Sequence, residues 1–103
     1  MVVLMELFSA ISTVLPQPAA YVVASLSGDY LYKGSSRNLR ERLKDHLAGR
    51  EVRTKNRRPL ALVYFEYCKS YSVALKQERF LKSGQGRRWL KQFLFQPGQT
   101  VPP

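Results

Sequence analysis

Residues 30–36 read YLYKGSS, and the order of residue types in this stretch decides how the surrounding chain folds. Tyr30 and Tyr32 are two positions apart, so an extended strand places both phenols on one face of a sheet and Lys33 on the other. Gly34 ends the predicted strand where a helix begins, and a glycine there permits a close approach of neighbouring atoms. The stretch therefore predicts a strand that brings two aromatic hydroxyls to the start of a basic helix.

A second strand precedes this one. Residues 20–25 form a β-branched run that contains Tyr21 and Val23, and residues 27–29 read SGD, which is a turn sequence. We therefore expect an antiparallel hairpin in which Tyr21 and Val23 share a face with Tyr32.

Residues 38–47 have the periodicity of an amphipathic helix. Its leucines recur at every fourth position, at Leu39, Leu43 and Leu47. They form one apolar stripe, and Ser35 or Ser36 is expected to cap the helix. Arg42 and His46, also four positions apart, lie on the face beside that stripe. The helix is therefore expected to pack through its leucines and to hold a guanidinium and an imidazole close to the sheet.

The second half of the chain adds a strand and two helices. Residues 60–68 form the clearest strand, after a polar loop at 48–59. A serine caps a helix that runs to residue 82, and a short helix covers residues 87–95. The order β-β-α-β-α-α predicts an α+β domain with a small, mainly antiparallel, three-stranded sheet flanked by helices.

The length of 103 residues predicts one domain, which we expect at 19–95. Residues 1–18 are an apolar extension, expected to be helical and to pack on the domain or on a second copy of the chain. Glu6 interrupts the extension, which lacks a basic start and is too short to span a bilayer, so we expect no signal peptide and no membrane anchor. Residues 96–103 are expected to be a disordered tail.

Positive charge is concentrated in the middle of the chain. The sequence has 17 Lys and Arg against 7 Asp and Glu, a formal net charge of +10. Residues 33–58 hold ten basic and three acidic side chains, whereas residues 1–32 hold two acidic side chains and no basic one. This distribution favours a polyanionic partner, because each phosphate neutralised by Lys or Arg releases counterions. On charge alone, a merely soluble basic surface explains the composition equally well.

Cys68 is the single cysteine of the chain. One cysteine excludes an intrachain disulfide and a cysteine-based zinc site, and it fits a reducing compartment, so we expect a cytoplasmic protein.

Glu78 is the most informative charged residue. On its predicted helix it lies four positions after Ala74 and three before Leu81, so its carboxylate shares their inward-facing stripe. A buried carboxylate has to be paired, protonated or bound to a cation, because leaving it alone is costly. Two interpretations follow: an ion pair, with Arg42 as the candidate partner, or a metal site.

Arg42 and His46 also allow two interpretations each. A guanidinium near the sheet can hold a phosphate in two hydrogen bonds, but most of the basic residues are simply solvated. An imidazole can relay a proton near neutral pH, or it can support a neighbour by hydrogen bonding.

Five spaced positions, taken in order, resemble the GIY-YIG nuclease domain of short, stand-alone bacterial proteins. They are Tyr21, residues 32–34 (YKG), residues 38–42 (NLRER), His46 and residues 74–78 (ALKQE). The resemblance runs from about residue 19 to residue 94. The first motif departs from the pattern, since residues 19–21 read AAY in place of Gly-Ile-Tyr.

The resemblance implies a metal-dependent DNA endonuclease that hydrolyses phosphodiester bonds with Mg²⁺ or Mn²⁺. The implied catalytic residues are Tyr21, Tyr32, Arg42, His46 and Glu78, and Gly34 is the structural glycine of the second motif. Glu78 would hold the ion, and Arg42 would neutralise phosphate oxygens. Tyr21 would accept or orient a proton of the attacking water, with Tyr32 and His46 assisting. Ser35 stands where some members have a lysine implicated in proton handling, which leaves the final proton acceptor open.

The implied partner is DNA, either branched, flap or duplex. The basic residues expected to contact it are Lys33, Arg37, Arg40, Arg53, Lys55, Arg57, Arg58, Arg87 and Arg88. Repair, mobile-element and restriction roles all fit. A catalytically inactive nucleic-acid-binding module of the same fold is the main alternative, and a basic assembly factor that forms a homodimer through residues 1–18 is a third.

Overall fold

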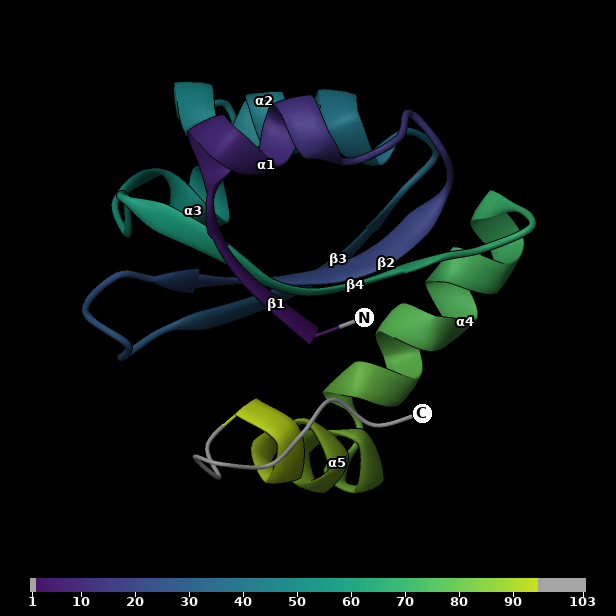
Figure 1. Cartoon of the computed structure of the whole chain (residues 1–103). Helices are drawn as coiled ribbons and strands as arrows, with labels where there is room; N and C mark the ends of the chain where they lie inside the picture. The colour runs from purple at the N-terminus through teal and green to yellow at the C-terminus, as the bar shows by residue number, and fades with distance from the viewer. Residues whose placement is uncertain (1, 95–103) are drawn as a thin grey trace.

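The computed structural model describes residues 2–94, which form a sheet with helices on both faces (Figure 1). In chain order the elements are β1 (Val2–Glu6), α1 (Leu7–Thr13), β2 (Ala19–Ser25), β3 (Leu31–Ser36), α2 (Leu39–Ala48), α3 (Val52–Lys55), β4 (Leu60–Tyr67), α4 (Tyr71–Lys82) and α5 (Gly84–Leu94). The tail predicted at 96–103 lies outside the described residues.

The sheet has four antiparallel strands in the order β1-β4-β2-β3. The α+β class with an antiparallel sheet is therefore confirmed, but the predicted count of three strands is wrong. Residues 2–6 form β1 rather than part of a helix, and Met5 lies opposite Leu62 of β4. Without β1, this side of β4 would expose a row of unpaired backbone N–H and C=O groups.

The helix expected in the N-terminal extension is confined to α1. Glu6 caps it, since its carboxylate accepts a hydrogen bond from the Phe8 N–H at 2.8 Å. Leu7, Ala10 and Val14 are buried in the core that α1 shares with the sheet. The extension is therefore an integral part of the domain.

Side chains of the strands alternate between two apolar cores. On one face, Tyr21 and Leu62 pack with Leu43 beneath α1 and α2. On the opposite face, Val22 packs with Leu81 of α4, and α5 closes the same core (Figure 1). This alternation confirms the predicted hairpin faces.

The helix boundaries around α2 differ from the prediction. Strand β3 continues through Ser36, so the residue that caps α2 is Asn38, whose side chain accepts a hydrogen bond from the Glu41 N–H at 3.1 Å. Gly49 ends the helix with a φ of 80°, which glycine adopts without strain. The chain then forms α3 inside the loop predicted at 48–59.

A serine cap and a glycine contact position the two helices of the second half of the chain. Ser70 caps α4 by accepting a hydrogen bond from the Val73 N–H. Helix α5 begins at Gly84, earlier than the predicted residue 87, and a Cβ atom on Gly86 would lie only 1.8 Å from the carbonyl oxygen of Phe80. The glycine therefore lets α5 turn tightly against the end of α4. Within residues 2–94, no helix has both the length and the apolar character needed to cross a bilayer.

Candidate active site

An open groove of about 540 Å³ lies where the edge strand β3 meets α2 and α4. Three of the predicted catalytic residues line this groove: Tyr32 of β3, Arg42 of α2 and Glu78 of α4. Tyr21 and His46 do not line it, and both are fully buried. The fold thus brings together side chains from three separate elements, with the other two predicted residues packed behind them.

Gly34 makes room for the phenols. It lies directly opposite Tyr21 in the β2–β3 ladder. A Cβ atom on Gly34 would lie 2.6 Å from Tyr21 Oη and 2.9 Å from a ring carbon of Tyr32. Both distances are far below the roughly 3.5–4.0 Å of ordinary nonbonded contact between carbon atoms. The glycine therefore has a steric role that involves both tyrosines.

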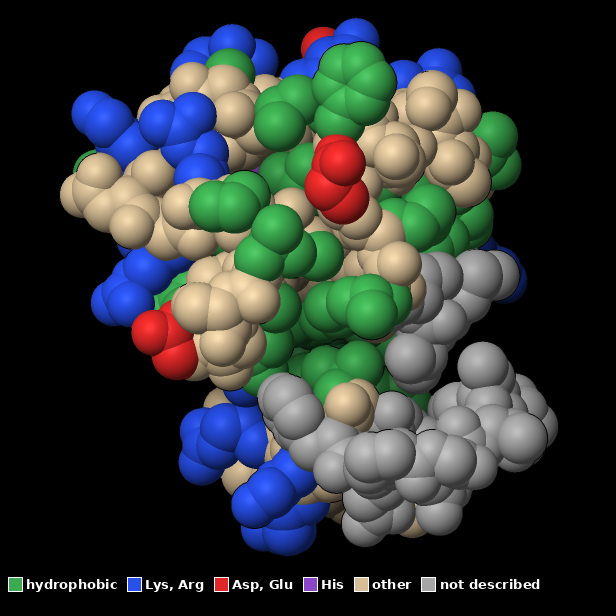
Figure 2. Space-filling view, turned by 60° about the vertical axis from the view of Figure 1, so that its left-hand side comes forward, with side chains coloured by type: hydrophobic (Ala, Val, Ile, Leu, Met, Phe, Trp, Pro, Cys, Tyr) green, Lys and Arg blue, Asp and Glu red, His purple; other side chains and the backbone are tan. Residues whose placement is uncertain are grey.

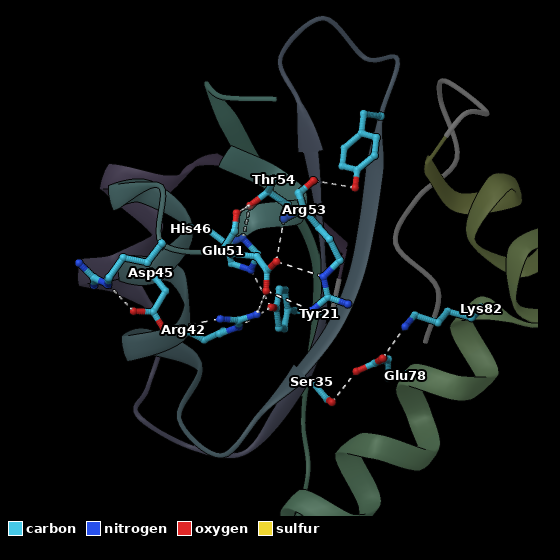
Figure 3. A network of polar contacts seen from close by, with 12 residues as sticks. Tyr21, Ser35, Arg42, Asp45, His46, Glu51, Arg53, Thr54, Glu78 and Lys82 are labelled. Carbon is cyan, nitrogen blue, oxygen red and sulfur yellow. Dashed lines mark hydrogen bonds and ion pairs between the residues drawn. The ribbon is translucent and has the colours of Figure 1, made fainter. Parts of the chain in front are cut away.

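A chain of hydrogen bonds runs from the groove into the core (Figure 3). Arg42 Nε donates to Tyr21 Oη at 3.2 Å, and Tyr21 Oη is 2.7 Å from His46 Nε2. The other ring nitrogen of His46, Nδ1, is 2.7 Å from Thr54 Oγ1. The edge of the His46 ring also faces Tyr32, with the ring centroids 5.2 Å apart. These contacts connect Arg42 at the surface to a buried imidazole.

Glu51 fixes two arginines at the edge of the groove (Figure 3). Its carboxylate is only 7% exposed and accepts hydrogen bonds from Arg42 Nη2 and from Arg53 Nε at 3.0 Å. The Arg53 N–H donates to it as well, because Glu51 caps α3. The bonds from Arg53 outweigh burial and lower the pKa of Glu51 to about 2. The acid is therefore charged throughout the physiological pH range.

Burial sets the protonation of the other residues in this hydrogen-bonded series. It lowers the pKa of His46 to about 4, with a further contribution from Arg42, and it raises the pKa of Tyr21 well above its usual range. Partial burial alone would lower the pKa of Arg42, but Tyr21 and Glu51 together raise it. The resting site consequently holds a neutral phenol and a neutral imidazole beside a permanently charged guanidinium.

Glu78 lies on the helical stripe of Ala74 and Leu81, but its side chain is 19% exposed and faces the groove. It accepts hydrogen bonds from Ser35 Oγ and from Lys82 Nζ, the latter at 2.6 Å. Burial opposes ionisation, yet the bonds from Lys82 and Ser35 lower the pKa of Glu78. The expected ion pair with Arg42 is not formed, because Arg42 binds Glu51 instead.

The donors present fit a divalent cation held by one carboxylate. Within residues 2–94, no three His, Cys, Asp or Glu side chains cluster around a common point. Mg²⁺ is commonly bound by one or two carboxylates, with waters and substrate phosphates completing its shell. Glu78 meets this requirement as an ionised acid in an open groove. The other two acids of the groove already have basic partners: Glu41 pairs with Lys44, and Asp45 pairs with Arg50 and, at 3.6 Å, with Arg42.

Of the basic residues predicted to contact DNA, Arg37 and Arg53 line the groove. Each guanidinium stacks on a tyrosine ring, Arg37 on Tyr71 at 4.4 Å and Arg53 on Tyr32 at 5.1 Å. Arg57 stacks in the same way on Tyr30, at 4.4 Å. These arginines are well placed to contact a polyanion.

The other predicted DNA-contacting residues do not line the groove, and three of them stabilise helix ends. Three donate to backbone carbonyls at helix C-termini, namely Arg40 to Val14, Arg58 to Leu47 and Arg87 to Lys82. Lys33 lies on the opposite face of the sheet, where burial and the nearby Arg87 and Lys82 lower its pKa. Lys55 lines a second hollow away from Glu78, and Arg88 is an exposed residue of α5.

Glu51 and Thr54 belong to the site but were not predicted from the sequence. Both belong to the segment around α3, which was predicted to be an irregular loop. Glu51 is the sole acid in residues 48–59, among five basic residues. An isolated acid within a basic segment is the signal that could have indicated an arginine-binding carboxylate.

Comparison with known proteins agrees with this geometry. The GIY-YIG catalytic domain matches residues 17–91, so the chain belongs to the GIY-YIG family, whose nucleases act on DNA. The chain is also similar to the "UPF0213 protein SH2523" of Staphylococcus haemolyticus. The two are 39% identical over 62 residues, which cover 59% of this chain and 76% of that protein. No solved structure matches the chain.

Proposed function

We propose that the protein is a metal-dependent endonuclease that hydrolyses phosphodiester bonds in DNA. The observation that supports this proposal most strongly is the convergence of Tyr32, Arg42 and Glu78 on one open groove. Phosphodiester hydrolysis needs a group that neutralises phosphate charge, a ligand for a cation and a group that orients water. These three side chains supply one of each.

Arg42 would bind the scissile phosphate. Its bonds to Tyr21 and Glu51 fix the plane of the guanidinium and use two of its five N–H donors, and Nη1 also lies 3.6 Å from a carboxylate oxygen of Asp45. The remaining donors can serve the oxygens of a phosphate at the groove surface. Because the raised pKa keeps Arg42 charged, it would stabilise the negative charge that grows in the transition state.

Glu78 would hold Mg²⁺ or Mn²⁺, an ion that polarises the phosphate and stabilises the leaving oxygen when bound. Ser35 and Lys82 hold the carboxylate of Glu78 in place through their hydrogen bonds. Lys82 also keeps a positive charge beside this acid, so it would compete with the cation for the carboxylate.

The two tyrosines would have different roles. Tyr32 lines the groove and would orient the attacking water through its phenol. The resemblance gave that role to Tyr21, but Tyr21 is fully buried and bonded to Arg42 and His46. We therefore assign Tyr21 and His46 to the support of Arg42. The proposed substrate is branched, flap or duplex DNA, and the proposed compartment is the cytoplasm.

Cleavage of supercoiled, branched and flap DNA, with Mg²⁺ or Mn²⁺ and with EDTA as control, tests this function. We expect Arg42→Ala to reduce the rate roughly 100-fold or more, as removal of one transition-state donor does in other enzymes. Arg79→Ala, which removes an exposed arginine of α4 outside the groove, should cleave at the wild-type rate. Equal rates for both variants would contradict the assignment of Arg42.

The contact between Lys82 and Glu78 favours one alternative, a DNA-binding module without turnover. In that case the ammonium permanently neutralises the acid, and the arginines of the groove only hold phosphates. This alternative predicts salt-sensitive DNA binding that persists in EDTA, with no cleavage of any of the three substrates.

We also propose self-association through the N-terminal extension. Leu4 and Phe8 are 80% and 74% exposed, and a second hollow of about 690 Å³ is lined by apolar residues together with Glu6, Lys55, Asn56 and Arg58. Figure 2 shows hydrophobic side chains gathered on one face of the molecule, with Lys and Arg at its margins. One acid and two bases within the hollow allow two copies to pair with opposite charges in contact. Sedimentation of wild type and of Phe8→Lys should give a dimer and a monomer; a monomeric wild type would rule the pairing out.

A further inference from the structure

The hydrogen positions along the buried hydrogen bonds from Arg42 to Thr54 follow from which groups can only donate or only accept. Arg42 Nε can only donate, so Tyr21 Oη accepts that bond at 3.2 Å. The phenol then has one hydrogen of its own, and its other contact is His46 Nε2 at 2.7 Å. Tyr21 therefore donates to Nε2, which has to carry a lone pair.

The contacts at the Thr54 end of this series of hydrogen bonds are compatible with the same tautomer. The backbone carbonyl of Glu51 can only accept, and Thr54 Oγ1 lies 3.5 Å from it, in the contact that threonine commonly makes with the preceding turn. When Thr54 donates toward Glu51, its oxygen accepts from His46 Nδ1 at 2.7 Å. The Tyr21 end therefore requires the imidazole tautomer that has its hydrogen on Nδ1, and the Thr54 hydroxyl can accept that hydrogen.

We propose that Thr54 is a positioning residue, which holds His46 in the Nδ1–H tautomer and thereby keeps Tyr21 as the acceptor for Arg42. The consequence for cleavage rests on the proposed function, whereas the tautomer itself does not. Thr54 is fully buried and does not line the groove, so it acts through His46 rather than on a substrate.

The alternative tautomer would break this arrangement. A hydrogen on Nε2 would point at Tyr21 Oη, which already receives the bond from Arg42. Among the contacts that residues 2–94 make with Tyr21 Oη, the phenol hydrogen would then have no acceptor, and a buried unsatisfied donor is costly. Tyr21 would have to turn away from either Arg42 or His46. If Tyr21 turned away from Arg42, the guanidinium that faces the proposed phosphate would lose one of the two hydrogen bonds that fix its plane.

Nitrogen-15 NMR of the imidazole tests the tautomer directly, and the chain contains one histidine, so the signals need no assignment among several. At neutral pH we expect wild-type His46 to show a protonated Nδ1 and an unprotonated Nε2. Thr54→Ser keeps the hydroxyl and should keep this spectrum. Thr54→Val has the same shape without the hydroxyl and should give a mixture of tautomers. A wild-type spectrum with the hydrogen on Nε2, or an unchanged spectrum in Thr54→Val, would overturn the inference.

Cleavage kinetics give the second readout. We expect Thr54→Val to lower kcat about 10- to 100-fold, in line with one unsatisfied buried donor, and to leave KM unchanged. Thr54→Ser should restore kcat, and Val52→Ala, an exposed change in the same helix, should have no effect. If wild type shows the expected spectrum but cleaves no DNA, the proposed function fails and the role of Thr54 in holding His46 stands.

Discussion

Gly34 shows how a single atom can determine the geometry of the site. Its missing Cβ would lie 2.6 Å from Tyr21 Oη, and the phenol cannot move without losing its bonds to Arg42 and His46. We expect Gly34→Ala to destabilise the fold by about 1–3 kcal/mol, the usual cost of overpacking. Urea unfolding measures this change.

Gly84→Ala is the matched control for this substitution. The nearest atoms to a Cβ on Gly84 are at 3.6 Å and 3.9 Å, both at the ends of flexible arginine side chains. The control should therefore unfold at or above the wild-type urea concentration. Equal losses of stability in the two variants would show that the space around Gly34 is not the reason for the glycine.

His46 predicts a specific loss of stability in acid. Its pKa is lowered from 6.5 to about 4 in the folded protein, so the unfolded chain binds a proton first as the pH falls. The groups that influence this imidazole are Tyr21, Tyr32, Arg42, Asp45, Glu51, Arg53 and Thr54. Stability should therefore fall between pH 6.5 and pH 4, by about 3 kcal/mol in total, and level off below that range for this group.

The His46→Gln variant isolates this contribution. It lacks the titrating imidazole, so its unfolding free energy should change much less between pH 6.5 and pH 4 than that of wild type. Urea unfolding at several pH values measures both slopes. If the two proteins have the same slope, the buried neutral imidazole is not the cause of the acid sensitivity.

At the scale of elements, the sequence predicted the parts that have a clear period. The hairpin, the leucine stripe of α2 and the strand β4 all follow from alternation or from a spacing of four. It failed for β1, because an apolar segment of five residues has no pattern that separates strand from helix. It failed for α3 as well, because a four-residue helix is held by its cap and by Arg42 and Arg53 rather than by propensity.

The candidate site was predictable to a similar extent. Tyr32, Arg42 and Glu78 were expected to converge, and they line one groove. The partners of these residues were not predictable, since the contact of Arg42 with Glu51 depends on how α3 folds back on α2. Basic residues that cap helices cannot be told from basic residues that face solvent without the structure.

Arg58 provides a test of that distinction. It donates to the carbonyls of Leu47 and Lys55 and so stabilises the ends of α2 and α3. We expect Arg58→Ala to lower the free energy of unfolding by about 1 kcal/mol. Arg88→Ala, which changes an exposed residue of α5, should stay within about 0.5 kcal/mol of wild type. A larger loss in Arg88→Ala than in Arg58→Ala would contradict the assignment.

At the scale of the whole molecule, the net charge is +10, and some of the basic residues line the groove while others bind the ends of helices. Arg37 lines the groove, whereas Arg40 donates both Nε and Nη2 to the carbonyl of Val14. The logarithm of the affinity for duplex DNA, measured in EDTA, should fall linearly with the logarithm of the salt concentration. Arg37→Gln should reduce the slope by about 1, and Arg40→Gln should leave it unchanged.

These two variants remove the same charge, so a difference between them reports position rather than net charge. Equal reductions in slope would mean that DNA does not distinguish the groove from the rest of the basic surface. In that case the binding would be a property of the charge alone.

The rate of DNA cleavage by Glu78→Gln, measured in single turnover with Mg²⁺, tests the central claim most directly. The control is Glu66→Gln, which changes a half-buried acid that bonds Tyr64 and does not line the groove. We expect Glu78→Gln to lose at least 100-fold in rate while it still binds DNA in EDTA, and Glu66→Gln to cleave normally. Cleavage by Glu78→Gln at the wild-type rate would contradict the account.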